Sequence, residues 1–201
     1  MLSVFFCAGV SVHAQTAKTT PKLSYKKNDV AIFAGGCFWC MEPPFDDYLG
    51  KGVIQTTVGF SGGTVKNPDY AMVASGKTDH VESIEVVFDP EKISYKKLLE
   101  IFYHNINPTD AGGQFADRGA HYRPVVFYNS PAQKKAAQEF KSSLEDSKKF
   151  QSPIVVDLKP ATEFYPAEQH HQEYYKKNPS RYYMYSTFSG RKGFLQEHWG
   201  K

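Results

Sequence analysis

The pattern of apolar positions predicts a folded domain that begins near Asp29 and contains several short strands. Residues 30–34 form an apolar run that stops at a pair of glycines, which is typical of a buried strand. Residues 81–88 alternate between apolar and polar positions and end at an Asp-Pro pair, as a half-buried strand does. Similar runs predict further strands over residues 53–60, 124–128 and 154–158.

Helical spacing predicts three longer helices between these strands. The first covers residues 37–49, and its proline pair must kink or restart it. Ser94 is the predicted N-cap of a second helix over residues 95–105, where leucine and phenylalanine recur at helical spacing. Ser130 is the N-cap of a long amphipathic third helix over residues 131–147, with proline at its first position.

The order of these elements predicts the fold class. A glycine-rich stretch over residues 107–121 follows the second helix, and the chain turns aromatic and irregular after Pro160. Strands and helices alternate, the strands are few and short, and no segment repeats. The pattern is typical of an α/β (α+β) two-layer sandwich with a ferredoxin-like arrangement, in which helices flank a mixed sheet.

The first residues suggest a targeting segment. Residues 2–12 form an apolar run of signal-peptide length that is too short to span a bilayer, and residues 12–14 place small side chains before a cleavage point. No basic residue precedes the run, so a disordered apolar tail is the alternative. We expect a signal peptide over 1–14, a flexible linker over 15–28, and a single domain with an irregular C-terminal tail over 29–201. The protein would then be exported, either periplasmic or secreted, and cytoplasmic if the segment is not a signal.

Composition narrows the function classes. The 201-residue chain has 41% hydrophobic residues, which suits one ordinary core, and 15% aromatic residues, which could also line a pocket. The formal net charge is only +3, and lysine and arginine are spread along the chain rather than concentrated in one segment. We therefore expect no nucleic-acid partner. We also expect no membrane contact after processing, and a monomer.

Cysteine usage points to chemistry rather than to a disulfide scaffold. The chain has three cysteines, and Cys7 lies within the predicted signal segment. Cys37 and Cys40 would remain after processing, and two thiols this close in sequence are too few and too near to brace a fold.

The segment Gly35-Gly36-Cys37-Phe38-Trp39-Cys40 is the strongest candidate for a reactive site. A thiol in the first turn of a helix faces the positive end of the helix dipole, which favours the nucleophilic thiolate, so Cys37 should be more acidic and more exposed than Cys40. Positions i and i+3 share a helix face, and slight unwinding would allow a disulfide. Buried structural cysteines, a thiol–disulfide carrier of the thioredoxin type, and a zinc site completed by His170 and His171 remain alternatives.

This segment resembles the signature of the A class of peptide methionine sulfoxide reductases, as Gly36-Cys37-Phe38-Trp39 is followed by Glu42. Further segments match the family in order, from about Val30 to Pro179: Val58-Gly59-Phe60-Ser61-Gly62-Gly63, Asn67-Pro68-Asp69-Tyr70, Ser75-Gly76-Lys77-Thr78-Asp79-His80-Val81-Glu82, Asp117-Arg118-Gly119-Ala120-His121-Tyr122-Arg123 and Pro166-Ala167-Glu168-Gln169-His170-His171-Gln172.

The chain departs from the family pattern at a few positions. Asp79 stands where glycine is usual, His121 where glutamine is usual, and His170 where tyrosine is usual. The tail after Asn178 contains no cysteine, whereas many family members resolve their intermediate with cysteines in a C-terminal arm.

The resemblance implies an enzyme that reduces the S epimer of methionine sulfoxide, free or in oxidised proteins, and makes the domain a catalytic one. It implies that Cys37 is the nucleophile, that Glu82 protonates the departing oxygen, and that Tyr70 and Tyr122 donate hydrogen bonds to it. It also implies that the substrate's methyl group packs on the aromatic side chains of Phe38 and Trp39. The backbone of the substrate would be held by Asp117 and His171.

Recycling should then pass through Cys40, because no other thiol remains after processing. A sulfenic acid on Cys37 would condense with Cys40, and a thioredoxin-like donor would reduce the disulfide. No cofactor and no metal are expected. Without the resemblance, Glu82 could face solvent on its alternating strand, and Tyr70 and Tyr122 could be ordinary core or surface rings.

Overall fold

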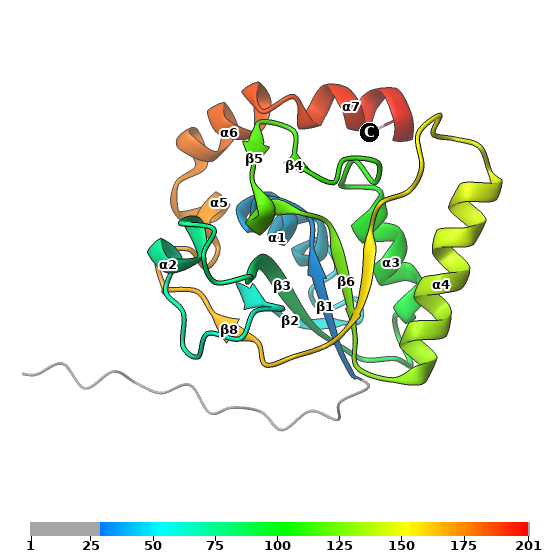
Figure 1. Ribbon diagram of the computed structural model, residues 1–201, viewed down its shortest axis with the longest axis horizontal. Coiled ribbons are helices and arrows are strands. Elements are labelled where there is room, and N and C mark those ends of the chain that lie inside the picture. Colours follow the sequence, from blue (N-terminus) through cyan, green and yellow to red (C-terminus); the bar gives the residue numbers. More distant parts are fainter. Residues whose placement is uncertain (1–28, 201) are drawn as a thin grey trace, which may run out of the picture.

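The computed structural model describes residues 29–200 of the chain (Figure 1). The predicted signal peptide over 1–14 and the linker over 15–28 lie outside the described residues. Among the helices of the described part, none is long and apolar enough to cross a membrane.

A six-stranded mixed sheet forms the centre of the fold. Its strand order is β7-β6-β1-β3-β2-β8, and only the β6–β7 pair is parallel. The strands are β1 (Val30–Ala34), β2 (Val53–Ser61), β3 (Val81–Phe88), β6 (Val125–Tyr128), β7 (Asp157–Pro160) and β8 (Tyr165–Pro166). The four central strands and the helices between them follow the order β-α-β-β-α-β, so the predicted ferredoxin-like arrangement is confirmed.

Three helices cover one face of the sheet and bury the main core. They are α1 (Phe38–Asp46), α3 (Tyr95–Tyr103) and α4 (Pro131–Asp146). Their buried apolar residues pack against Phe33 of β1 and Val86 of β3 in one continuous cluster. Ser94 and Ser130 cap α3 and α4 as predicted, since each hydroxyl accepts a backbone N–H three residues ahead. The two-layer sandwich is therefore confirmed.

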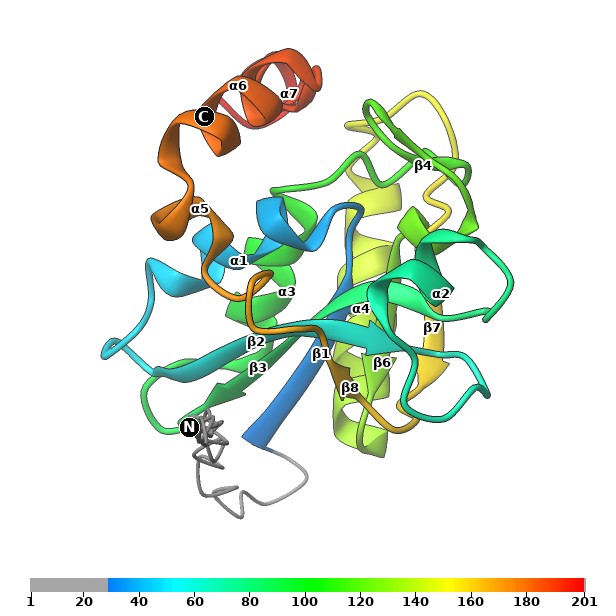
Figure 2. The same ribbon diagram turned by 90° about the vertical axis from the view of Figure 1, so that its left-hand side faces the viewer.

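The prediction of an irregular C-terminal tail is wrong. This segment folds into α5 (Tyr174–Lys177), α6 (Pro179–Phe188) and α7 (Arg191–Trp199). Both ribbon views show α6 and α7, in orange to red, beyond α1 on the side away from the sheet (Figure 1, Figure 2). The sequence of α6 is rich in tyrosine and carries no clear apolar stripe, so the usual helical pattern is missing.

Smaller differences have local causes. The first helix ends at Asp46 rather than near residue 49, and it continues through both prolines, which lie inside it and stand close to its C-terminal end. The last predicted strand is shifted to Asp157–Pro160, because Ile154 and Val156 are buried in the core without pairing in the sheet.

Short elements also lie in segments for which the sequence analysis predicted no helix or strand. Helix α2 (Tyr70–Ala74) is capped by Asp69. The glycine-rich stretch holds the β4 (Gly113–Gln114) and β5 (Asp117–Arg118) hairpin and the 3-10 turn η2 (Ala120–Tyr122). These segments are too short to show a period in the sequence.

Candidate active site

The cysteine pair lies where β1 passes into α1. Gly36 has a φ of +83°, and a Cβ on it would lie 2.5 Å from the Gln114 Cβ, so only glycine fits this junction. Cys37 is the N-cap of α1, and its sulfur makes no capping bond to the helix backbone. The Cys40 N–H donates to the Cys37 carbonyl over 3.0 Å, which places the two residues on one turn.

Most of the predicted site residues meet around one small cavity. Its volume is about 160 Å³, and its walls come from α1, α2, β3, the β5–η2 segment and α6. It is lined by Cys37, Phe38, Trp39, Tyr70, Glu82, Asp117, Tyr122 and Tyr185. Seven of the nine residues singled out from the sequence are in this set, and the structure therefore brings them together.

Glu82 does not face solvent, which the alternating pattern of its strand had left open. Its side chain is 2% exposed, and one carboxyl oxygen accepts the Phe38 N–H over 3.0 Å. Burial raises the pKa of the Glu82 carboxyl to about 8, although the Phe38 hydrogen bond acts in the opposite direction. A carboxylic acid beside the Cys37 thiol is therefore mostly protonated at neutral pH.

Tyrosines supply further donors to the same cavity. Burial is the largest cause that raises the pKa of Tyr70, of Tyr122 and of Tyr185, and nearby acidic groups act in the same direction. All three phenols therefore keep their protons at neutral pH. The Tyr185 hydroxyl also donates to the Asp117 carboxylate, which fixes both groups at the cavity wall.

The two thiols differ in the opposite sense to the prediction. Burial raises the pKa of Cys37 well above its ordinary value, and its hydrogen bond to Cys40 acts in the same direction. That hydrogen bond is the main cause that lowers the pKa of Cys40 to about 7. The expectation of a more acidic Cys37 is therefore wrong for the substrate-free protein, because an aromatic, dry cavity outweighs the helix dipole. The two side chains are almost equally buried, since Cys37 is 6% exposed and Cys40 is 3% exposed.

His171 stands behind the cavity rather than on its wall. Its Nδ1 accepts the Trp39 indole N–H over 3.1 Å, and its ring lies 4.5 Å from the Tyr70 ring and 5.2 Å from the Phe38 ring. Trp39 stacks on Tyr174, with ring centroids 3.7 Å apart. These contacts hold the aromatic wall of the cavity in place. In this structure His171 therefore supports Trp39 and does not line the cavity.

Other residues of the matched motifs dock the late segment onto the sheet. The Gln172 amide accepts from the Val58 N–H and donates to the Val58 carbonyl, over 2.9 and 2.8 Å. Glu42 is buried and accepts the Glu173 N–H over 2.9 Å. Glu168 accepts the Tyr70 N–H over 3.0 Å, which ties α2 to the same segment.

One departure from the family pattern has a structural counterpart. Asp79 has a φ of +58°, in the left-handed region where glycine is the least strained residue. This conformation accounts for the usual glycine, and aspartate is among the residues that tolerate it.

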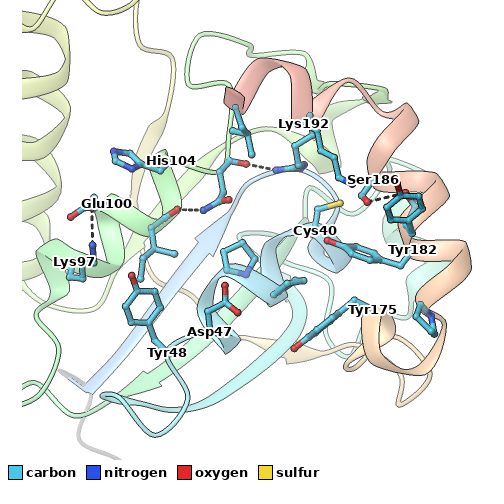
Figure 3. Close-up of a pocket in the computed structure, with 18 residues that line it drawn as sticks. Cys40, Asp47, Tyr48, Lys97, Glu100, His104, Tyr175, Tyr182, Ser186 and Lys192 are labelled. Atoms are coloured by element: carbon cyan, nitrogen blue, oxygen red, sulfur yellow. Dashed lines mark hydrogen bonds and ion pairs between the residues drawn. The ribbon is translucent and has the colours of Figure 1, made fainter. Parts of the chain in front are cut away.

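A second, larger cavity lies on the other side of α1 (Figure 3). Its volume is about 650 Å³, and α1, α3, α6 and α7 form its walls. Figure 3 shows Cys40 beside Tyr182 at one end of this groove. Cys37 thus faces one cavity and Cys40 lines another.

The sequence did not single out Tyr185, Tyr182 or Arg191. All three belong to α6 and α7, in the segment that was predicted to be irregular. The dense run of tyrosines over residues 182–185 was the one available signal, and an aromatic cluster alone does not say which cavity it lines. Within residues 29–200, no group of three or more His, Cys, Asp and Glu side chains is placed to hold a metal ion.

Comparisons with known proteins agree with this site. The family described as peptide methionine sulfoxide reductase matches residues 29–201. The peptide methionine sulfoxide reductase MsrA of Bacillus licheniformis is 48% identical over 176 residues, covering 88% of this chain and 96% of the relative. The Bacillus subtilis MsrA is 49% identical over 175 residues, covering 87% and 98%.

Solved structures are similar as well. Reduced Mxr1 from Saccharomyces cerevisiae has a TM-score of 0.72 at 27% identity, covering 81% of this chain and 93% of that one. Methionine sulfoxide reductase A of Corynebacterium diphtheriae has a TM-score of 0.66 at 31% identity, covering 75% of each chain. The fold, the assembled cavity and the family match agree, and the chain is an oxidoreductase that belongs to the peptide methionine sulfoxide reductase family.

Proposed function

We propose that this protein reduces the S epimer of methionine sulfoxide, free or within oxidised proteins, to methionine, with Cys37 as the nucleophile. One observation carries the proposal. The Glu82 carboxyl is buried in the same 160 Å³ cavity as the Cys37 thiol, and its raised pKa keeps it protonated at neutral pH. Reduction of a sulfoxide needs this combination, because a nucleophile must attack sulfur while an acid protonates the oxygen.

The first step forms a sulfenic acid and releases methionine. The Cys37 sulfur attacks the sulfoxide sulfur, Glu82 gives its proton to the sulfoxide oxygen, and the Cys37 proton restores the Glu82 acid. The oxygen is transferred to Cys37 as S–OH, so Cys37 is oxidised by two electrons and the sulfoxide is reduced by two. No net proton is taken up, which suits a buried site with little water.

The cavity walls supply orientation. Tyr70 and Tyr122 remain protonated and can donate to the oxygen, while Phe38 and Trp39 offer an aromatic surface to the methyl group. With donors on one side and rings on the other, the cavity has a fixed hand and should accept one epimer. Asp117 lines the cavity, where it can accept the backbone N–H of a peptide substrate, and His171 keeps Trp39 in place.

The second step closes the catalytic cycle. The Cys40 thiol condenses with the Cys37 sulfenic acid, which forms a Cys37–Cys40 disulfide and releases water. A thioredoxin-like dithiol then reduces this disulfide and becomes oxidised itself. The closeness of the two thiols supports this route, because each of them acts on the pKa of the other.

We also propose that the protein works after export, as a monomer. The apolar run over residues 2–12 and the small side chains at residues 12–14 support cleavage before Gln15. The mass of the purified cellular protein tests the cleavage, since processing would remove residues 1–14.

The decisive experiment is turnover with dithiothreitol on separate S and R epimers of methionine sulfoxide. We expect reduction of the S epimer only, and complete loss of turnover in Cys37→Ser. Equal rates on both epimers, or substantial turnover by Cys37→Ser, would contradict the proposal. Insulin reduction without sulfoxide turnover would instead indicate a thiol–disulfide carrier, and stoichiometric zinc without either activity would indicate a structural zinc module.

A further inference from the structure

Arg191, at the start of α7, is a buried cation outside the substrate cavity. It is 6% exposed, and its guanidinium donates to the carbonyls of Asn105 and, over 3.3 Å, of Gly35. Its Nη1 lies 3.9 Å from the Met41 sulfur, and its charge lies 4.7 Å from the centre of the Phe115 ring. Arg191 thus joins α7 to the ends of β1 and α3, directly behind the cysteine pair.

No carboxylate accepts a hydrogen bond from this charge in the described part of the chain. Its side-chain hydrogen bonds to oxygen go to the carbonyls of Asn105 and Gly35, and its charge acts on Asp117 only through a longer-range interaction that favours the carboxylate. A buried charge without a directly paired counterion is expensive, so a nearby group that can become negative is favoured in its ionised form. Anchoring α7 would not need a charge, since a neutral donor could bond the same carbonyls.

Besides Asp117, Cys40 can provide negative charge near Arg191. It lines the 650 Å³ groove together with Arg191, Tyr182 and Ser186, and the charge of Arg191 favours its thiolate. Of the groups facing Cys40, Cys37 and Tyr182 donate to its thiolate, Arg191 attracts it, and Asp117 opposes it. The other charged or titratable neighbours are Glu82 on β3, Tyr185 on α6, and the groove residues Asp47, Tyr48, Lys97, Glu100, His104, Tyr175, Tyr183 and Lys192.

We propose that Arg191 is a positioning residue for the second half of the reaction, and that its buried charge holds Cys40 as the thiolate that attacks the Cys37 sulfenic acid. This inference rests on the proposed function and adds the residue that prepares the resolving thiol. Arg191 touches neither the sulfoxide nor the oxygen that is transferred, and it acts through Cys40.

The step balances with groups that are present. The Cys40 thiolate forms a bond to the Cys37 sulfur, the S–OH bond breaks, and the hydroxide leaves with one proton as water. The proton that the hydroxide takes up is matched by the proton that Cys40 released when it ionised. The overall step therefore converts a thiol and a sulfenic acid into a disulfide and water. Since only the thiolate attacks, the rate should follow the ionised fraction of Cys40.

The test measures the ionisation of Cys40 directly. In a Cys7→Ser/Cys37→Ser background, the serine at position 37 can still donate a hydrogen bond, and Cys40 is the one remaining thiol. Thiolate absorbance near 240 nm is followed against pH and corrected with the matching Cys40→Ser protein. Arg191→Gln removes the charge but keeps donors for the carbonyls, and Arg191→Lys keeps the charge.

A matched control lies next in the sequence. Lys192 lines the same groove, but it is exposed to solvent and its ammonium group donates to Thr187. Arg191→Gln should raise the midpoint of Cys40 ionisation by about one pH unit or more, the usual effect of losing a close opposite charge. Arg191→Lys and Lys192→Met should each leave the midpoint within a few tenths of a unit.

An unchanged midpoint in Arg191→Gln, or an equal shift in Lys192→Met, would overturn the proposal. Should Arg191→Gln fail to fold, the parent enzyme supplies the test after a single turnover without reductant. Loss of the sulfenic acid, monitored by trapping with dimedone, should become faster as pH rises and a larger fraction of Cys40 ionises. A rate that does not change over about three pH units, from roughly 6 to 9, would also overturn the proposal. Failure of the parent to release methionine would instead refute the proposed function.

Discussion

Glu82→Gln should make the protein more stable and much less active. The amide has nearly the same shape as the carboxyl, and its oxygen can still accept the Phe38 N–H that Glu82 accepts over 3.0 Å. What the substitution removes is a titratable group that is 2% exposed and whose pKa burial raises to about 8.

The stability gain follows from linkage between protonation and folding. In the unfolded chain a glutamate releases its proton near pH 4.5, whereas folded Glu82 holds it up to about pH 8. Between these values the folded state binds more protons, so the parent loses stability as pH rises and keeps its full value only below about pH 4.5. At 1.36 kcal/mol for each unit of pKa difference, this loss amounts to about 3 kcal/mol at pH 7.

Urea denaturation at several pH values measures this difference. Glu82→Gln should match the parent near pH 4 and exceed its unfolding free energy by up to about 3 kcal/mol at pH 7. Removing the general acid should also slow sulfoxide reduction by roughly 10² to 10⁴. Glu42→Gln is the matched control, because Glu42 is also buried with a pKa raised by burial to about 7, but it bonds the Glu173 N–H away from the substrate cavity.

The difference in unfolding free energy between Glu42→Gln and the parent should also grow as pH rises. The rate of sulfoxide reduction by Glu42→Gln should stay within a few-fold of the parent's rate. Two results would refute the reasoning. A Glu82→Gln protein that reduces sulfoxide within a factor of two of the parent would show that Glu82 is not the acid. A stability difference that does not grow between pH 4 and pH 7 would show that Glu82 is not held in its protonated form.

Further predictions concern the cavity wall and the turn before Cys37. Tyr122→Phe removes a donor to the sulfoxide oxygen and should lower kcat by about tenfold, as expected for a lost hydrogen bond to developing charge; an unchanged kcat would count against that role. Tyr185→Phe removes the hydrogen bond that lowers the pKa of Cys37, so the first-turnover rate should reach its maximum at a higher pH than in the parent, and an identical pH profile would contradict this. Gly36→Ala should destabilise the protein by more than about 1 kcal/mol in urea, because its φ is +83°, and a smaller loss would show that the turn can relax.

The sequence predicted the sheet and its flanking helices well because those elements carry regular signals. The strand at Val81–Phe88 has the predicted bounds, and Ser94 and Ser130 are N-caps as expected. The site residues came from ordered motifs, and most of them do line one cavity. Chemistry that depends on residue type at a fixed spacing is visible in the sequence.

Properties that depend on packing were not visible. The contribution of α6 and α7 was missed, because Tyr185 and Arg191 reach the cysteines only after the tail folds back over α1. The acidity order of Cys37 and Cys40 was reversed for the same reason. Helix position favours the first thiol, but burial and the surrounding charges decide the outcome, and neither can be read from spacing.

The central claim is that Cys37 takes the oxygen and that Cys40 resolves the product. Mass spectrometry of the enzyme after exposure to methionine S-sulfoxide without reductant tests it most directly. The parent should become lighter by about 2 Da as the Cys37–Cys40 disulfide forms, and Cys40→Ser should become heavier by about 16 Da at Cys37. A parent enzyme that keeps one added oxygen on Cys37, or a Cys40→Ser protein that carries none, would contradict the account.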